Sequence, residues 1–149
     1  MGSEFDYTQA ERWDRDITAG QYQKFYIETP IEEVEFTIGA MATRTVTVGV
    51  QVVDPAGDAI AEQFTLQLFL CSDDAGTTPA YGNVTVAEGA DGNILVNGLA
   101  TDTAIVVVTD DEGKVELDFT LASGALTRYL GCVLPNGKYQ VSTVLTWTA

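Results

Sequence analysis

Acidic side chains are the residues of this sequence most able to do chemistry, because histidine is absent from it altogether. Without histidine the chain has no Ser-His-Asp or Cys-His nucleophile, and it lacks both the commonest general base and the usual zinc and copper ligand. It also contains no G-x-S-x-G, Walker A or G-x-G-x-x-G motif. The chemistry left open is glycoside hydrolysis by paired carboxylates, or calcium binding by clustered ones.

The acidic clusters lie in predicted turns or at solvent-facing strand positions. The loop acids are Asp73, Asp74, Asp91, Asp110, Asp111 and Glu112. No stretch matches the EF-hand pattern, and aspartate is favoured in turns in any case because its side chain bonds to the nearby backbone. Catalytic carboxylates need a cleft that raises one pKa, and a small sandwich has little spare chain to build one. We therefore predict no enzyme, no metal site and no cofactor.

The charge balance restricts the partners. With 22 acidic and 7 basic residues, the net charge of -15 opposes binding to nucleic acid and to an anionic membrane surface. We interpret this charge as a source of solubility, with a basic protein partner as the alternative. No uninterrupted apolar run is long enough to span a bilayer, and we expect that a secretory signal is absent or was removed.

The two cysteines, Cys71 and Cys132, both lie in apolar stretches. A disulfide between two strands is one interpretation, but we favour two reduced thiols, because free cysteine behaves as a small buried hydrophobe. The pair also departs from the disulfide pattern of antibody domains, since no tryptophan follows Cys71 closely and Leu130 stands where a tyrosine is expected.

The first 30 residues are predicted to form an arm in front of a domain that covers residues 31–149. Six aromatic residues gather in this arm: Phe5, Tyr7, Trp13, Tyr22, Phe25 and Tyr26. A short helix over 8–15 and an edge strand over 17–29 are possible within it, and Pro30 marks its end. Grouped aromatic rings are typical of interface anchors, so we predict that these six residues bind a partner. The alternative is that they cap the chain's own sandwich.

From residue 31 onward, apolar and polar residues alternate with a period of two, which indicates half-buried strands. Turns separate eight expected strands at residues 43–53, 62–71, 82–87, 93–97, 103–109, 114–121, 127–134 and 138–148. The β-branched run at 105–108 indicates burial on both faces, and Tyr139 and Trp147 are expected to share an inward face. We predict an all-β fold, an antiparallel β-sandwich of immunoglobulin-like or jelly-roll-like type with about eight strands and an extended N-terminal arm.

The stretch from Thr45 to Ala149 resembles a β domain of virion proteins of tailed bacteriophages. The likeness lies in the order and spacing of turn motifs and their flanking strands, at residues 46–58, 70–76, 108–115 and 129–138. The resemblance implies a structural protein without an active site, such as a capsid decoration (cement) protein, a head fibre or a tail-associated module. It implies the major capsid protein or other virion proteins as partners, and a place on the capsid surface.

On this basis we expect docking through the arm and one sheet edge, together with self-association, for which a trimer at a local threefold axis is our guess. A tail or head-tail structural protein of a phage is one alternative. A bacterial surface immunoglobulin-like module is a second, and it predicts a secreted parent with tandem copies. A carbohydrate-binding module is a third, and it requires a row of exposed aromatic residues on one sheet face.

Overall fold

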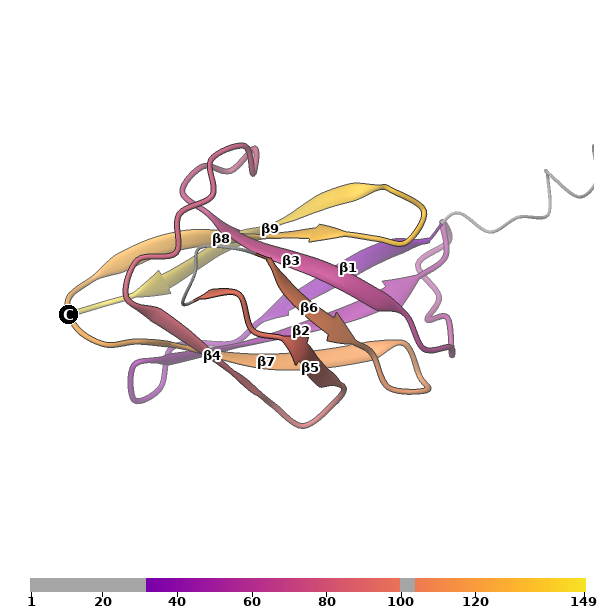
Figure 1. Ribbon diagram of the computed structural model, residues 1–149, viewed down its shortest axis with the longest axis horizontal. Coiled ribbons are helices and arrows are strands. Elements are labelled where there is room, and N and C mark those ends of the chain that lie inside the picture. Colours follow the sequence, from indigo (N-terminus) through magenta and orange to yellow (C-terminus); the bar gives the residue numbers. More distant parts are fainter. Residues whose placement is uncertain (1–31, 100–103) are drawn as a thin grey trace, which may run out of the picture. The chain divides into compact units, whose positions relative to one another are not determined.

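A computed structural model describes residues 32–99 and 104–149, which form two antiparallel β-sheets packed as a sandwich (Figure 1). The predicted all-β sandwich is therefore confirmed. The predicted arm, residues 1–30, lies outside the described residues, and so do its six aromatic side chains. Within the described part, no helix is long and apolar enough to cross a membrane.

The described residues contain nine strands, one more than the sequence analysis expected. They are β1 (Glu33–Ile38), β2 (Thr45–Val53), β3 (Thr65–Cys71), β4 (Val84–Glu88), β5 (Asn93–Val96), β6 (Ile105–Val108), β7 (Lys114–Leu121), β8 (Leu126–Val133) and β9 (Tyr139–Trp147). Eight of them correspond to the expected strands. The additional strand, β1, has the same alternation as the others, with Val34 buried between Glu33 and Glu35.

The strand order places β1-β2-β7-β4 in one sheet and β5-β6-β3-β8-β9 in the other. The neighbours β1-β2-β7 and β3-β8-β9 have the pairing of strands A-B-E and C-F-G in an immunoglobulin sandwich. Strand β4 lies beside β7 in the place of strand D, whereas β6 and then β5 are additional strands that extend the other sheet beyond β3. The sandwich thus has the order of seven immunoglobulin strands, with β5 and β6 inserted between the fourth and the fifth of them in the chain.

The core lies between the two sheets and follows the alternation of the sequence. Val46, Val48 and Val50 of β2 face Leu66 and Leu68 of β3 across the core, and all are at most 1% exposed. Each such side chain stabilises the fold by about 1.5–3 kcal/mol through removal from water. Within the core, Nε1 of Trp147 on β9 donates a hydrogen bond of 3.2 Å to the carbonyl of Phe119 on β7, which links one sheet to the other.

A β-bulge in β9 overturns one prediction about side-chain direction. Tyr129 pairs with Val144 and Gly131 pairs with Val141, so two residues of β9 oppose Leu130 alone. The amide of Leu130 donates instead to the hydroxyl of Ser142, at 2.9 Å. An extra residue reverses the alternation beyond it. Trp147 is buried as expected, but Tyr139, which we expected to point inward with it, is 40% exposed on the outer face.

The β-branched run of β6 is buried on one face only, whereas the sequence suggested burial on both. Ile105 and Val107 are fully buried in the core. Val106 and Val108 point the other way and are only partly covered. A continuous apolar run shows that neither face of a strand carries polar groups, but it does not show that the protein itself covers both faces.

Candidate interaction site

The outward face of the four-stranded sheet is polar and charged. Its outward positions carry the acids Glu33, Glu35, Glu116 and Asp118 together with Lys114. Neighbouring side chains bond to one another across the strands: the Thr47 hydroxyl donates to Oδ1 of Asp118 at 2.6 Å, and the hydroxyls of Thr45 and Thr120 lie 2.8 Å apart. This face has the composition of an ordinary solvated sheet surface.

A shallow trough of about 230 Å³ crosses this polar face where Gly49 leaves no side chain. The polar groups around it already have partners within the chain. Gln51 Nε2 donates to the carbonyl of Glu112 at 2.9 Å, and Glu116 Oε1 accepts from the amide of Ala90 at 2.9 Å. Lys114 forms an ion pair with Asp91. The trough therefore offers no pair of carboxylates facing each other across a closed cleft, which acid–base catalysis would need.

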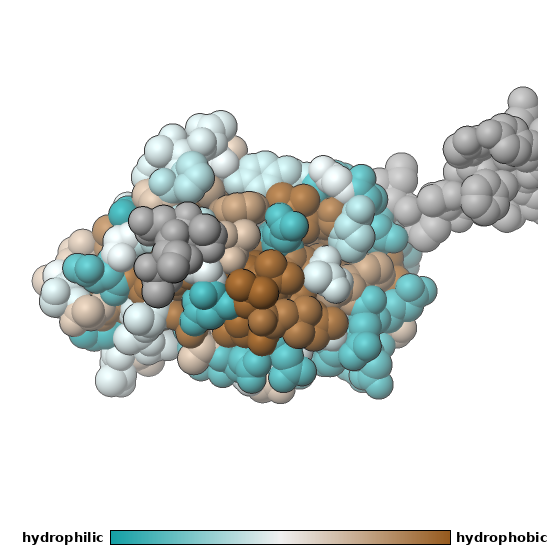
Figure 2. All heavy atoms as spheres, in the orientation of Figure 1, coloured by the Kyte–Doolittle hydropathy of each residue, from teal (hydrophilic) through white to brown (hydrophobic). Residues whose placement is uncertain are grey.

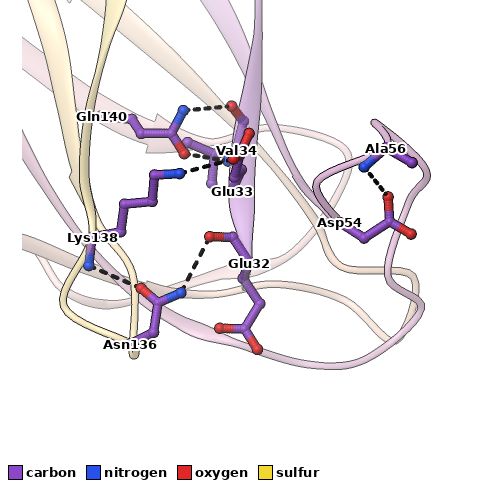
Figure 3. A network of polar contacts seen from close by, with 8 residues as sticks. All are labelled: Glu32, Glu33, Val34, Asp54, Ala56, Asn136, Lys138 and Gln140. Atoms are coloured by element: carbon purple, nitrogen blue, oxygen red, sulfur yellow. Dashed lines mark hydrogen bonds and ion pairs between the residues drawn. The ribbon is translucent and has the colours of Figure 1, made fainter. Parts of the chain in front are cut away.

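In three of the acidic turns, one aspartate is engaged by its own loop. Asp73 accepts from the amide and the hydroxyl of Thr77, with the hydroxyl at 2.6 Å, and these bonds lower the pKa of Asp73. Asp54 accepts from the amide of Ala56 at 3.0 Å (Figure 3). Asp110 accepts from the amide of Lys114. Across the described residues, no three acids, cysteines or histidines come together as a metal site.

The outward face of the five-stranded sheet is uncharged and carries several apolar side chains, with polar residues such as Gln67 among them. Val96 pairs with Val106, which in turn pairs with Gln67, and side chains paired across antiparallel strands point to the same side. We define the outer patch as the apolar residues of this face on β5, β6, β3 and β8: Leu95, Val96, Val106, Val108, Phe69 and Val133. Leu95 is 57% exposed and Val96 is 53% exposed. Figure 2 shows hydrophobic atoms gathered over β5 and β6 with hydrophilic atoms around them.

This sheet is also nearly without charge, although the chain as a whole carries -15. Its five described strands contain a single charged residue, Arg128. The guanidinium of Arg128 donates to the carbonyl of Ala80 at 2.7 Å and to that of Thr127 at 2.8 Å. The acidic character of the described residues is thus confined to the opposite sheet and to the turns, and it leaves this face neutral.

At one end of the neutral face, Tyr139 and the loop between β3 and β4 cover Cys71. The ring of Tyr139 lies against Gly131, where a side chain would collide with it. Its hydroxyl donates to the carbonyl of Gly76 at 2.7 Å and lies 3.6 Å from Sγ of Cys71. Burial and the Cys71 thiol raise the pKa of Tyr139. The chain itself therefore covers Cys71 at this end of the face, whereas Leu95 and Val96 at the other end are more than half exposed.

The two cysteines are both buried and both free, in agreement with the interpretation favoured from the sequence. They lie on the adjacent strands β3 and β8, but Cys132 pairs with Leu68 and Cys71 pairs with Tyr129. The two thiols are therefore three positions apart along the strands and on opposite faces of the sheet. A disulfide needs Cα atoms closer than about 7 Å, with the Cβ atoms facing each other.

We expect the stability of the fold to decrease between about pH 9 and pH 12, because burial raises the pKa of the Cys132 thiol from 9.0 to about 12. In this range the unfolded chain releases the thiol proton while the folded chain keeps it, so unfolding becomes more favourable by at most about 1.4 kcal/mol per pH unit. Urea unfolding at pH 8 and pH 10.5 measures the effect. The Cys132→Ala variant should lose less stability over this interval, and an identical loss would contradict the assignment.

Strand β1 is attached to the β8–β9 hairpin at the point where the described residues begin (Figure 3). The side-chain amide of Gln140 accepts a 2.7 Å hydrogen bond from the amide of Val34 and donates to the carbonyl of Val34 at 3.4 Å. Lys138 Nζ pairs with Glu33 at 2.8 Å, and Asn136 donates to the carbonyl of Glu32 at 3.2 Å. Gln140 thus takes the place of a neighbouring strand along the free edge of β1.

Replacing Gln140 by alanine should lower the free energy of unfolding by about 1–3 kcal/mol, because Val34 would lose its side-chain partners at a largely covered edge. Amide hydrogen exchange at Val34 should become faster in the same variant, since β1 would open locally. Thr37→Ala, at an exposed residue of β1 itself, is the matched control and should leave exchange at Val34 unchanged. Unchanged exchange at Val34 in the Gln140 variant would contradict this role.

The outer patch is a site that the sequence analysis missed. The six residues predicted to bind a partner, Phe5, Tyr7, Trp13, Tyr22, Phe25 and Tyr26, all lie outside the described residues. A signal for the patch was present, because β3, β5, β6 and β8 have few charged residues and β6 has none at its outward positions. That signal was interpreted as burial, since composition does not distinguish a covered face from an open one.

No family model and no curated protein matches this chain. Among solved structures, the GAE domain of GGA2p from Saccharomyces cerevisiae is similar, with 9% sequence identity and a TM-score of 0.29. The similarity covers 82% of this chain and 91% of that one. At that TM-score, it carries no argument about function.

Proposed function

We propose that this chain is a non-enzymatic structural protein of a phage virion, and that it acts as a capsid decoration protein. In this proposal it docks onto the major capsid protein or other virion proteins through its N-terminal arm and a sheet edge. The observation that best supports an interaction role is the outer patch, because an open apolar sheet face with a polar surround is typical of protein-binding surfaces. The assignment to a virion rests on the sequence resemblance.

The geometry favours binding over catalysis. The trough on the four-stranded sheet is shallow, and the polar side chains that line it are bonded within the chain. A decoration protein needs no reaction centre, because it works by adding buried area across the joints of a lattice. Many copies make modest individual contacts sufficient.

A carbohydrate-binding function is supported less well by the described residues. Trp147 and Tyr81 are buried at 0% and 4% exposure, so neither can stack on a sugar. Tyr139 is exposed, but its ring lies against Gly131 and its hydroxyl is engaged by Gly76. A glycan array tests this alternative directly, and specific binding would favour it over the virion proposal.

Deletion of residues 1–30 tests the docking role of the arm. We expect the shortened chain to remain folded and soluble, as judged by circular dichroism, and to lose docking onto particles. The decisive experiment for the virion assignment is mass spectrometry of purified particles, followed by location of the chain in them by electron cryomicroscopy. Absence of the chain from the particles would overturn the assignment, whereas unfolding of the shortened chain would overturn only the idea of a separate arm.

A further inference from the structure

The outer patch raises the question of which surface covers it. The outer patch extends over four adjacent strands, and at about 4.8 Å between strands and 3.3 Å per residue it has a plan area on the order of 300 Å². Patches of this size lie within the range that marks functional surfaces on single proteins. A stable dimer buries about 800 Å² on each partner, so the patch suffices as the apolar centre of an interface whose rim is polar.

The distribution of charge identifies a second copy of the chain as an occupant that fits. Two copies with a net charge of -15 each repel one another in most orientations. The exception is the arrangement in which the neutral five-stranded sheets face each other, because the charged four-stranded sheets then lie on the two outer sides. With sheets about 10 Å apart, the charged faces would be separated by about 30 Å, beyond the screening length of about 8 Å at physiological salt.

We propose that the outer patch is the centre of a homodimer interface in which two copies pack the outward faces of their β5-β6-β3-β8-β9 sheets against each other. A face that pairs with the same face of a second copy is related to it by a twofold axis and closes as a dimer. The trimer guessed from the sequence requires two different surfaces on each copy. The modest area of the patch leads us to expect dissociation in the micromolar range.

The test is the oligomeric state of the full chain, measured by sedimentation equilibrium from about 1 to about 500 µM. We expect Val96→Glu and Leu95→Glu to weaken the dimer at least tenfold, because each places two like charges in the interface. Both residues are more than half exposed, so the fold should tolerate the substitutions, which thermal unfolding verifies. Thr37→Glu places the same charge on the opposite, four-stranded sheet and should leave the dimer unchanged.

Several results would overturn the proposal. A chain that stays monomeric over the whole range, or that forms trimers, contradicts a twofold interface. An equal loss with Thr37→Glu would show that net charge rather than the outer patch governs association. If the triple variant Tyr22→Ser, Phe25→Ser and Tyr26→Ser dissociates the dimer as Val96→Glu does, the N-terminal segment is the occupant. The measurement uses purified protein, so its outcome is independent of whether the chain is found in virions.

Discussion

Replacing Trp147 by alanine is expected to lower the free energy of unfolding by about 3–5 kcal/mol, the largest effect of any single change considered for this chain. The ring is fully buried and lies at the end of β9, where it joins the five-stranded sheet to Phe119 of the four-stranded sheet. The variant would leave a cavity and would also remove the donor to the Phe119 carbonyl. Urea unfolding followed by far-ultraviolet circular dichroism measures the loss.

Two further variants separate the contributions of Trp147. Trp147→Phe keeps much of the ring and loses the Nε1 donor, so we expect it to cost less than the alanine variant. Val144→Ala, on the same strand but 41% exposed, should cost less than about 1 kcal/mol. If Trp147→Ala costs no more than Val144→Ala, the ring is not part of the core and does not join the two sheets.

The second large effect is expected at Gly113, in the turn between β6 and β7. Gly113 has a positive φ of 78°, and its carbonyl accepts a 2.9 Å hydrogen bond from the amide of Val52. A Cβ atom there would collide with the carbonyl oxygen of Ile60. We expect Gly113→Ala to cost about 3 kcal/mol or more, because it combines backbone strain with displacement of the segment that contains Ile60.

Gly124 provides a matched control for the collision. It has nearly the same backbone conformation, with φ of 77°, but no atom lies within 4 Å of the position that its Cβ would take. Gly124→Ala should therefore cost only about 1–2 kcal/mol, the strain of a left-handed alanine. The difference between the two variants in urea unfolding measures the collision. Equal costs would show that Ile60 does not approach Gly113 closely.

The two outward faces of the sandwich differ in charge, and this difference supports a role in binding a protein partner. A strongly acidic protein can remain soluble and still keep one neutral apolar face, provided that its charges are placed elsewhere. In the described strands Arg128 is the only charged residue of the five-stranded sheet, and its guanidinium is turned to backbone carbonyls. An open surface of this kind favours association with a protein partner, while the remaining surface prevents unspecific aggregation.

The sequence alone determined that the chain forms strands and where the turns lie. Alternation in β2, β3 and β7 specifies one apolar face per strand, and turn residues such as Pro135-Asn136-Gly137 mark the reversals. These are local properties, since each depends on residues a few positions apart. They were sufficient to predict a sandwich and the burial of both cysteines. Strand β1 was missed despite a local signal of the same kind.

Tertiary structure decided which surfaces are covered and which remain open. The bulge opposite Leu130 turned Tyr139 outward, and pairing of β6 with β3 and β5 left Val106 and Val108 on an uncovered face. Strand register and sheet order arise from contacts between residues far apart in the chain, which a period of two does not encode. For the same reason the sequence could show that apolar residues were abundant in β6, but only the assembled sheets show that half of them face outward.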